Sequence, residues 1–323
     1  DCLLSRGLGD VYKRQQNALF ELTSNAPISF FNGMRSENSA DYNLSFNGAR
    51  TDQVNVYGGW WDANGDPGKH MSHLSFANHF NPQQIPMVVW SLLSAQSVSD
   101  FGEHSSSVDS EINWGVDYLI RNVDNEGYLY LAIFDDWGND ELSREICEWG
   151  DVSGQDSKRS SNYQAAMREG AGLAIAALAR ASADGYQDAA LALSKAEILY
   201  NHLMSVGDGY ATKNLEYCND HTENIIDIYC GLLATVELYR ATDNETYKID
   251  AIAFANRLLA LQGVNGEVYS DENVKNRPFY HASDEGLPII ALNEFLTIDS
   301  SLDSEIIIYT YSWLNWFTTI SYE

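Results

Sequence analysis

Basic residues are scarce in this sequence, and their scarcity excludes several classes of partner. The chain has 323 residues, with 19 Lys and Arg against 46 Asp and Glu and a formal net charge of −27. A protein that binds nucleic acid must place cations on phosphates, and an anionic membrane surface makes the same demand. We therefore expect no nucleic acid and no membrane among the partners, and a neutral or cationic partner instead.

Long apolar runs and paired cysteines are also missing. No stretch reaches the roughly 18 to 20 apolar residues that a membrane span needs, and no signal segment opens the chain. With residues 1–15 set aside, Cys147, Cys218 and Cys230 remain without a Cys-x-x-Cys pair, so no disulfide framework is predicted. Cys218 and His221 have a zinc-like spacing, but two further ligands are not evident nearby, and we interpret them as ordinary buried or partly buried residues.

Both ends of the sequence are atypical. Residues 1–15 resemble translated sequencing-adapter read-through and lack an initiating Met, so they are excluded from the fold prediction. The final residues stop within a strongly apolar pattern, without a helix cap or a polar tail. We expect the chain to be cut at both ends.

Apolar positions recur every three or four residues through most of the chain, which predicts an all-α fold of helix hairpins. In residues 224–242, for example, Ile225, Ile228 and Leu232 lie on one stripe of a helix. Short links between segments make neighbouring helices antiparallel. The predicted helices cover residues 17–36, 83–99, 108–124, 162–182, 186–206, 224–242, 251–259, 284–298 and 304–320.

Two long stretches without helical periodicity interrupt the series, at residues 37–81 and 125–161. The second contains the best strand candidate, residues 127–134. Loops of this length inside a compact domain are usually functional. The first contains GGWWDANGDPGK (58–69), in which two acids closely follow two tryptophans.

Three interpretations of that run compete. A calcium loop fails because Pro67 stands where an EF-hand needs glycine. A turn-rich loop with Trp60 and Trp61 in the core is the second. The third is a carboxylate pair, Asp62 and Asp66, that binds one water molecule for the hydrolysis of an acetal.

The run also resembles the signature of glycoside hydrolase family 9, the cellulase family, whose pattern reads roughly D-x-x-G-G-W-[YF]-D-A-G-D-x-x-K. Asn55 and Trp61 depart from this pattern, and Asn64 is an extra residue between the two acids, as in a subgroup common in gut and environmental bacteria. The resemblance extends from Gln16 to the last residue and includes REICEW (144–149), NYQAAMREGAGLAIAALARAS (162–182), ENIIDIYCGLLATVELYRAT (223–242) and RPFYHASDEGLPIIAL (277–292).

This resemblance implies an (α/α)6 barrel, of which the chain would supply about nine of twelve helices. Residues 16–323 would be the N-terminal three quarters of a single catalytic domain. The implied enzyme is an inverting endo-β-1,4-glucanase, secreted or periplasmic, that needs no organic cofactor. Residue by residue, the match makes Asp66 the general base and Asp62 the residue that helps to hold the water.

The general acid of the family is a Glu near the C-terminus of its catalytic domain, and we expect it beyond Glu323. Within the chain, Glu169 and Glu285 are less suitable, because helix residues beside charged neighbours are more often structural. An acidic loop at residues 135–145 offers Asp135, Asp136, Asp140 or Glu141 to calcium, although a solvated loop is the favoured interpretation.

Substrate contacts are predicted from the chemistry of glucose, whose apolar faces suit aromatic platforms. For each candidate, packing in the core is an equally good alternative. Other helical-barrel glycosidases that act on anionic uronides, and a glycan-binding barrel without catalysis, remain alternative functions. The shortage of Lys and Arg speaks against the uronide. We expect a monomer. The candidate contacts are Trp61, Trp137, Tyr163, Tyr280 and His281.

Overall fold

Helices dominate the part of the chain that the computed structural model describes. That part comprises residues 23, 25–47, 50–63, 66–74, 80–81, 84–134, 144–147, 163–279 and 285–320. One helix covers residues 25–33. The other α-helices are α2 (Ile85–Val98), α3 (Ser105–Asn122), α5 (Ala171–Ala183), α6 (Ala189–Met204), α7 (Lys213–Tyr217), α8 (Ile225–Thr242), α9 (Glu245–Ala260), α10 (Leu287–Leu296) and α11 (Asp303–Ile320).

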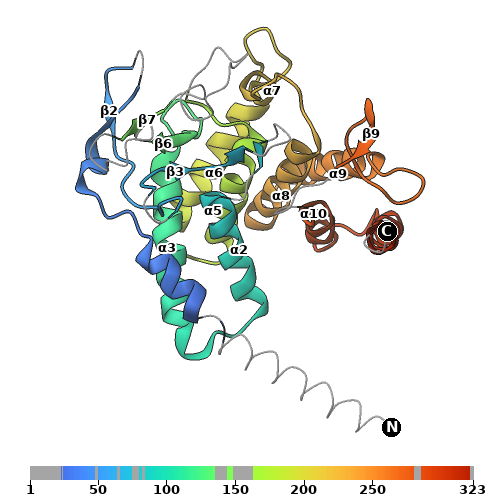
Figure 1. Ribbon diagram of the computed structural model, residues 1–323, viewed down its shortest axis with the longest axis horizontal. Helices are drawn as coiled ribbons and strands as arrows, with labels where there is room; N and C mark the ends of the chain where they lie inside the picture. The colour runs from blue at the N-terminus through green and yellow to red at the C-terminus, as the bar shows by residue number, and fades with distance from the viewer. Residues whose placement is uncertain are drawn as a thin grey trace.

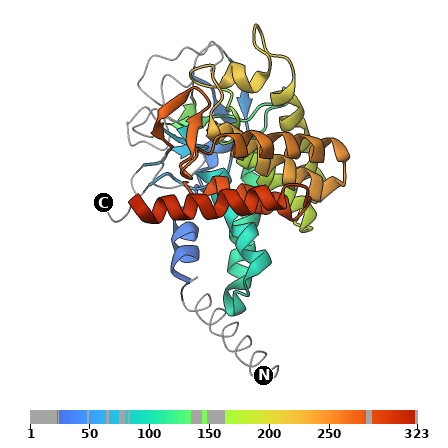
Figure 2. The ribbon, with the colours of Figure 1, turned by 90° about the vertical axis from the view of Figure 1, so that its right-hand side faces the viewer.

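The longer helices form two layers, as Figure 1 shows. In the inner layer, α2 packs on α5, α5 on α8 and α8 on α10. Each inner helix is followed in sequence by an outer partner, which gives the pairs α2–α3, α5–α6, α8–α9 and α10–α11. In Figure 2, α11 lies lengthwise beside α9 on the outside. The predicted antiparallel hairpins are therefore confirmed.

The inner layer is tight because its helices are rich in small residues. Every residue of α5 from Ala171 to Ala181 is buried. At Gly172 a Cβ atom would stand 2.7 Å from the Cβ of Cys230 on α8, so the two helices approach each other almost backbone to backbone. A helix that is apolar on all sides belongs inside a layered structure rather than at its surface.

Most of the labelled short strands lie together at the upper left of Figure 1, beside the helices. Two-stranded pairs join β1 (Leu44–Ser45) to β2 (Gln53–Val54), β4 (His73–Leu74) to β5 (Phe80–Asn81) and β8 (Tyr269–Asp271) to β9 (Val274–Pro278). A three-stranded antiparallel sheet has the order β3 (Lys69–His70), β6 (Ala132–Phe134) and β7 (Glu145–Ile146).

The strand predicted over residues 127–134 is confirmed in its second half, where β6 forms the centre of this sheet. In its register Lys69 faces Ile133, and Ile133 faces Ile146. Because β6 is completely buried, it fixes β3 against the helices. The motif of Asp62 and Asp66 thus leads directly into a strand that pairs with the buried strand β6.

The helix predicted over residues 162–182 begins later than expected, at Ala171. The preceding residues pair with the extended segment after α3: Leu131 donates its amide to Tyr163, and Ala165 donates to Leu129. A short 3-10 helix, η3 (Met167–Glu169), follows. Non-local pairing therefore overrides the helical propensity of this alanine-rich segment.

The three cysteines within the described ranges are all buried thiols, namely Cys147, Cys218 and Cys230. The Cys218 thiol donates to Asp227 over 3.6 Å, whereas the His221 ring contacts a backbone carbonyl and stacks on Tyr210. The two residues thus have different partners, as the packing interpretation predicts. Among the residues described, no helix is long and apolar enough to cross a membrane.

Candidate active site

Asp62 and Asp66 lie on one tight hairpin that precedes β3. The amide of Asp62 donates to the carbonyl of Gly68 over 2.9 Å, and the amide of Asp66 donates to Ala63 over 3.0 Å. The Asp66 carboxylate accepts the amide of Gly68 at 2.9 Å, which closes a turn of the kind that aspartate favours. Asp62 is exposed and Asp66 half-buried, so solvent reaches this hairpin.

The glycines before the hairpin are required by close packing against α3. Gly59 has φ +73°, and a Cβ atom there would stand 2.9 Å from the Tyr118 ring. Its carbonyl accepts the Trp114 indole N–H at 2.8 Å. Only glycine combines this backbone conformation with this close approach, which explains the paired glycines of the motif.

The two tryptophans of the motif have different environments. Trp60 is 3% exposed and donates its indole N–H to the Glu111 carboxylate over 3.1 Å. This is the core role that the turn-loop interpretation assigned to both rings. Trp61 is only half-buried, and its backbone amide donates to the carbonyl of Met34 over 3.0 Å.

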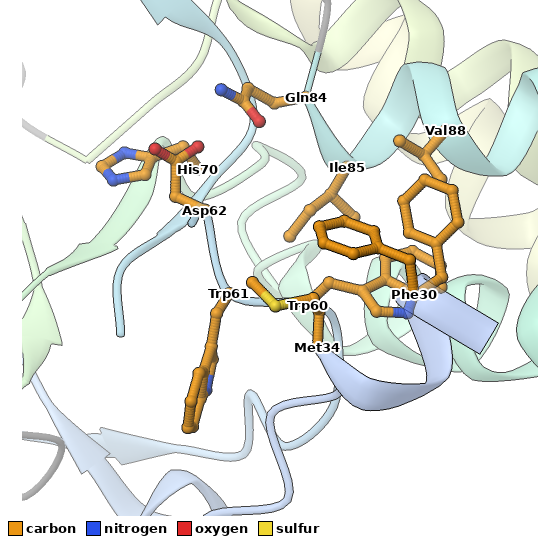
Figure 3. Close-up of a pocket in the computed structure, with 10 residues that line it drawn as sticks. Phe30, Met34, Trp60, Trp61, Asp62, His70, Gln84, Ile85 and Val88 are labelled. Carbon is orange, nitrogen blue, oxygen red and sulfur yellow. The ribbon is translucent and has the colours of Figure 1, made fainter. Parts of the chain in front are cut away.

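A pocket of about 80 Å³ opens beside Asp62. Figure 3 shows the Asp62 carboxylate at the same end of this pocket as His70 and Gln84, with the apolar side chains at the other end. Such a mixture of an apolar wall and a few polar groups is typical of ligand-binding sites. The lining consists of Phe30, Phe31, Met34, Trp60, Trp61, Asp62, His70, Gln84, Ile85 and Val88.

Strand β3 places its two side chains in different environments, as alternation along a strand requires. His70 lines the pocket, close to the Asp66 turn: both its Nε2 and an Asp66 oxygen lie within 3.0 Å of the Cβ position that Gly68 lacks. Lys69 is completely buried. Burial lowers the pKa of Lys69 to about 7, although the neighbouring Asp41 carboxylate acts to raise it.

Some predicted site residues lie outside the described residues, and others are placed in the core. Tyr163 is buried, packs edge-on against Phe46 with 5.0 Å between ring centroids, and donates its hydroxyl to the Asn47 carbonyl. This is the packing alternative left open for that residue. Those outside the described residues are Trp137, Tyr280, His281 and the acidic residues Asp135, Asp136, Asp140 and Glu141.

The two glutamates considered as acids within the chain differ in their surroundings. Glu169 is fully buried and accepts backbone amides from Ala166 and Asn219 on its two oxygens. Those bonds fix the turn before α5 and leave the carboxylate a structural role. Glu285 is half-buried, and burial raises its pKa.

His70 and Gln84 are pocket residues that the sequence prediction missed. His70 lies directly after the motif, so its position was the signal that could have identified it. Gln84 comes from the residue before α2, and no local pattern predicts its approach to Asp62. Among the residues that the structure describes, no three His, Cys, Asp or Glu side chains come together to hold a metal ion.

Comparisons with known proteins agree with this architecture. Solved structures with similar folds include a family 9 glycoside hydrolase of Bacteroides ovatus (16% identity, TM-score 0.54), an endoglucanase of the termite Nasutitermes takasagoensis (15%, 0.53) and a cellulase of C. cellulolyticum (14%, 0.52). The matches cover 92%, 92% and 91% of this chain but 56%, 64% and 65% of those chains. The chain thus spans between half and two thirds of their length. No curated protein matches the sequence.

The fold is therefore that of the (α/α)6 barrel glycosidases, as predicted. A family model described as "Glycosyl hydrolase family 9" matches residues 20–284. The chain belongs to glycoside hydrolase family 9.

Proposed function

We propose that this chain forms the larger part of the catalytic domain of an inverting endo-β-1,4-glucanase that acts on cellulose or related β-glucans. The observation that supports this most directly is the hairpin with Asp62 and Asp66, which lies beside a pocket with an aromatic wall in a family 9 chain. In this proposal Asp66 takes the proton from the attacking water and Asp62 helps to orient that water. Because such a polymer lies outside the cell, we also propose that the protein is secreted or periplasmic.

Inversion requires a separate acid on the opposite side of the scissile bond, far enough from the base to admit water. In the complete protein, a glutamate C-terminal to residue 323 would be that acid. Trp61 would present its ring to a glucose face, since it is the half-buried tryptophan of the pocket. No organic cofactor takes part in this reaction.

The test is the release of reducing sugar from carboxymethyl cellulose and mixed-linkage β-glucan by the complete protein. Asp66→Asn should lower kcat by about 10²- to 10⁴-fold, the contribution of a general base. Asp100→Asn is the matched control, because Asp100 also accepts the amide of a glycine two residues on, Gly102, at 2.9 Å. That variant should keep wild-type activity.

The stereochemistry is measured separately. Proton NMR of the first products should show the α-anomer, which a single displacement at a β-linkage generates. A folded complete protein that binds β-glucan without cleaving it would overturn the enzymatic proposal in favour of a glycan-binding barrel.

A further inference from the structure

A buried cluster of three charges lies beneath the hairpin of Asp62 and Asp66. It consists of Asp41, from the 3-10 helix η1 (Ser39–Asn43), with Lys69 and Arg144. The Asp41 carboxylate binds Lys69 Nζ through Oδ2 and an Arg144 terminal nitrogen through Oδ1, both over 2.7 Å. None of the three side chains is exposed. One buried anion therefore holds two buried cations.

Each cation has a second contact, on the backbone of the segment that includes the hairpin. Lys69 Nζ donates to the carbonyls of Val56 and Gly58 over 2.7 and 2.9 Å. Arg144 donates through its other terminal nitrogen to the carbonyl of Pro67 over 2.9 Å. The first two carbonyls precede Asp62, and the third follows Asp66 directly. The cluster thus fixes the chain on both sides of the carboxylate pair.

We propose that Asp41 and Arg144 are positioning residues for Asp62 and Asp66. Arg144 links the Asp41 carboxylate to the backbone next to Asp66. It thereby sets the position and direction of the Asp66 carboxylate. This inference rests on the proposed function for its effect on catalysis. The geometric part, that Arg144 holds the hairpin in place, does not depend on the reaction.

Energetic considerations indicate that the buried cluster serves the accurate placement of the hairpin more than the stability of the fold. Taking three charges out of water is costly, and buried ion pairs can often be replaced by apolar residues without loss of stability. Catalysis, in contrast, is sensitive to placement, because a displacement of about 1 Å in a reacting group can cost about 10²-fold in rate. The planar guanidinium is suited to this task, since it donates in two fixed directions at once.

The decisive variant is Arg144→Lys in the complete protein. Lysine keeps a positive charge beside Asp41, but its single nitrogen cannot occupy the two positions from which the separate guanidinium nitrogens of Arg144 reach Asp41 and the Pro67 carbonyl, so we expect the contact with Pro67 to be lost. We expect kcat on β-glucan to fall by about ten- to a hundredfold, with KM changed by less than about twofold because the pocket wall is untouched. Arg180→Lys is the matched control: Arg180 is also buried and donates to a buried carboxylate, Glu237, over 3.0 Å, but it lies on α5.

A second readout does not need catalysis. The amides of Asp62 and Gly68 donate within the hairpin, and their hydrogen exchange reports on its order. Both should exchange faster in Arg144→Lys than in the wild type and in Arg180→Lys. If the wild type cleaves no β-glucan, the proposed function fails while this exchange still decides the positioning role.

Should Arg144→Lys not fold, Ser36→Ala provides the same test in a milder form. The Ser36 hydroxyl accepts from Arg144 over 3.3 Å and contacts Asp41 over 3.4 Å, and its removal leaves all three charges in place. It should lower kcat by about threefold or more at constant KM. Unchanged kcat in a folded variant, or an equal fall in Arg180→Lys, would overturn the inference.

Discussion

Gly170, at the start of α5, lies against the backbone of Met71, the residue that follows β3. A Cβ atom on Gly170 would stand 2.3 Å from the Met71 carbonyl oxygen. Gly170 also has a φ of +106°, which glycine favours. The backbone just before the inner helix α5 and the backbone just after β3 are therefore in close contact. This contact fixes the depth at which β3 lies over the helices.

Gly170→Ala should accordingly destabilise the fold. The added methyl group must displace backbone, so we expect a loss of about 2–4 kcal/mol in the free energy of unfolding, measured with urea. Gly185→Ala is the control, because Gly185 has φ +75° with no atom within 4 Å of its missing Cβ. That variant should lose only about 1 kcal/mol, the cost of the left-handed conformation. Equal losses would mean that the contact with Met71 is unimportant.

Glu111→Gln should loosen the wall of the pocket. The Glu111 carboxylate accepts from Asn32, Arg35 and the Trp60 indole, and its side chain is 1% exposed. In the glutamine variant one carboxylate oxygen is replaced by an NH2 group, which is a donor and would face the N–H groups that the oxygen accepted. About 3 kcal/mol should therefore be lost from the free energy of unfolding. The measurement is urea unfolding followed by tryptophan fluorescence. Glu103→Gln, whose side chain is 81% exposed, should change stability by less than about 0.5 kcal/mol.

Glu169→Gln tests whether this glutamate acts only in the fold. Its two oxygens each accept one backbone amide, and glutamine offers a single acceptor oxygen, so about 1–3 kcal/mol should be lost. The kcat of the folded fraction should stay within about threefold of the wild type. A fall in kcat as large as that of Asp66→Asn, at an unchanged fraction folded, would instead make Glu169 a catalytic residue.

The lowered pKa of Lys69 predicts that the stability of the fold depends on pH. Its pKa in the folded chain, about 7, lies below the ordinary value of 10.5 because of burial. Between these pH values the unfolded chain binds more protons, so the free energy of unfolding rises with pH. Relative to Lys69→Met, the wild type should gain up to about 1.4 kcal/mol per pH unit as the pH rises from about 7 to about 10.

Urea unfolding of both proteins across that range gives the difference directly. Lys248→Met is the control, since its hydrogen bond to Asp299 raises the pKa of Lys248 and removes any such trend below about pH 10. If the difference in the free energy of unfolding between the wild type and Lys69→Met does not change with pH, Lys69 keeps its proton over the whole range because of Asp41.

Local signals explain what could be predicted from the sequence. Apolar residues at helical spacing located α2, α8 and α11 to within a few residues, because this spacing depends only on neighbours in the sequence. The carboxylate pair was found because both acids lie in one short motif. Residues 163–166 were misassigned, since their extended form depends on hydrogen bonds to Leu129 and Leu131 far away in the chain.

The buried cluster could not be predicted in this way. Asp41 is one of 46 acidic residues, and nothing around it in the sequence distinguishes it from a surface aspartate. Its partner Arg144 lies 103 positions away. Only the folded arrangement brings the two together, whereas the pairing of consecutive helices follows from the sequence pattern alone.

That difference in sequence separation has a consequence for how the molecule folds. Pairs such as α5–α6 and α8–α9 join helices that are adjacent in the chain, and contacts between near neighbours form early because little chain entropy is lost. The bond from Arg144 to Asp41 closes a loop of about a hundred residues, so its formation costs more chain entropy. We expect these helix pairs to form first and the hairpin of Asp62 and Asp66 to reach its final geometry late, so the carboxylate pair would be among the last parts of the chain to become ordered.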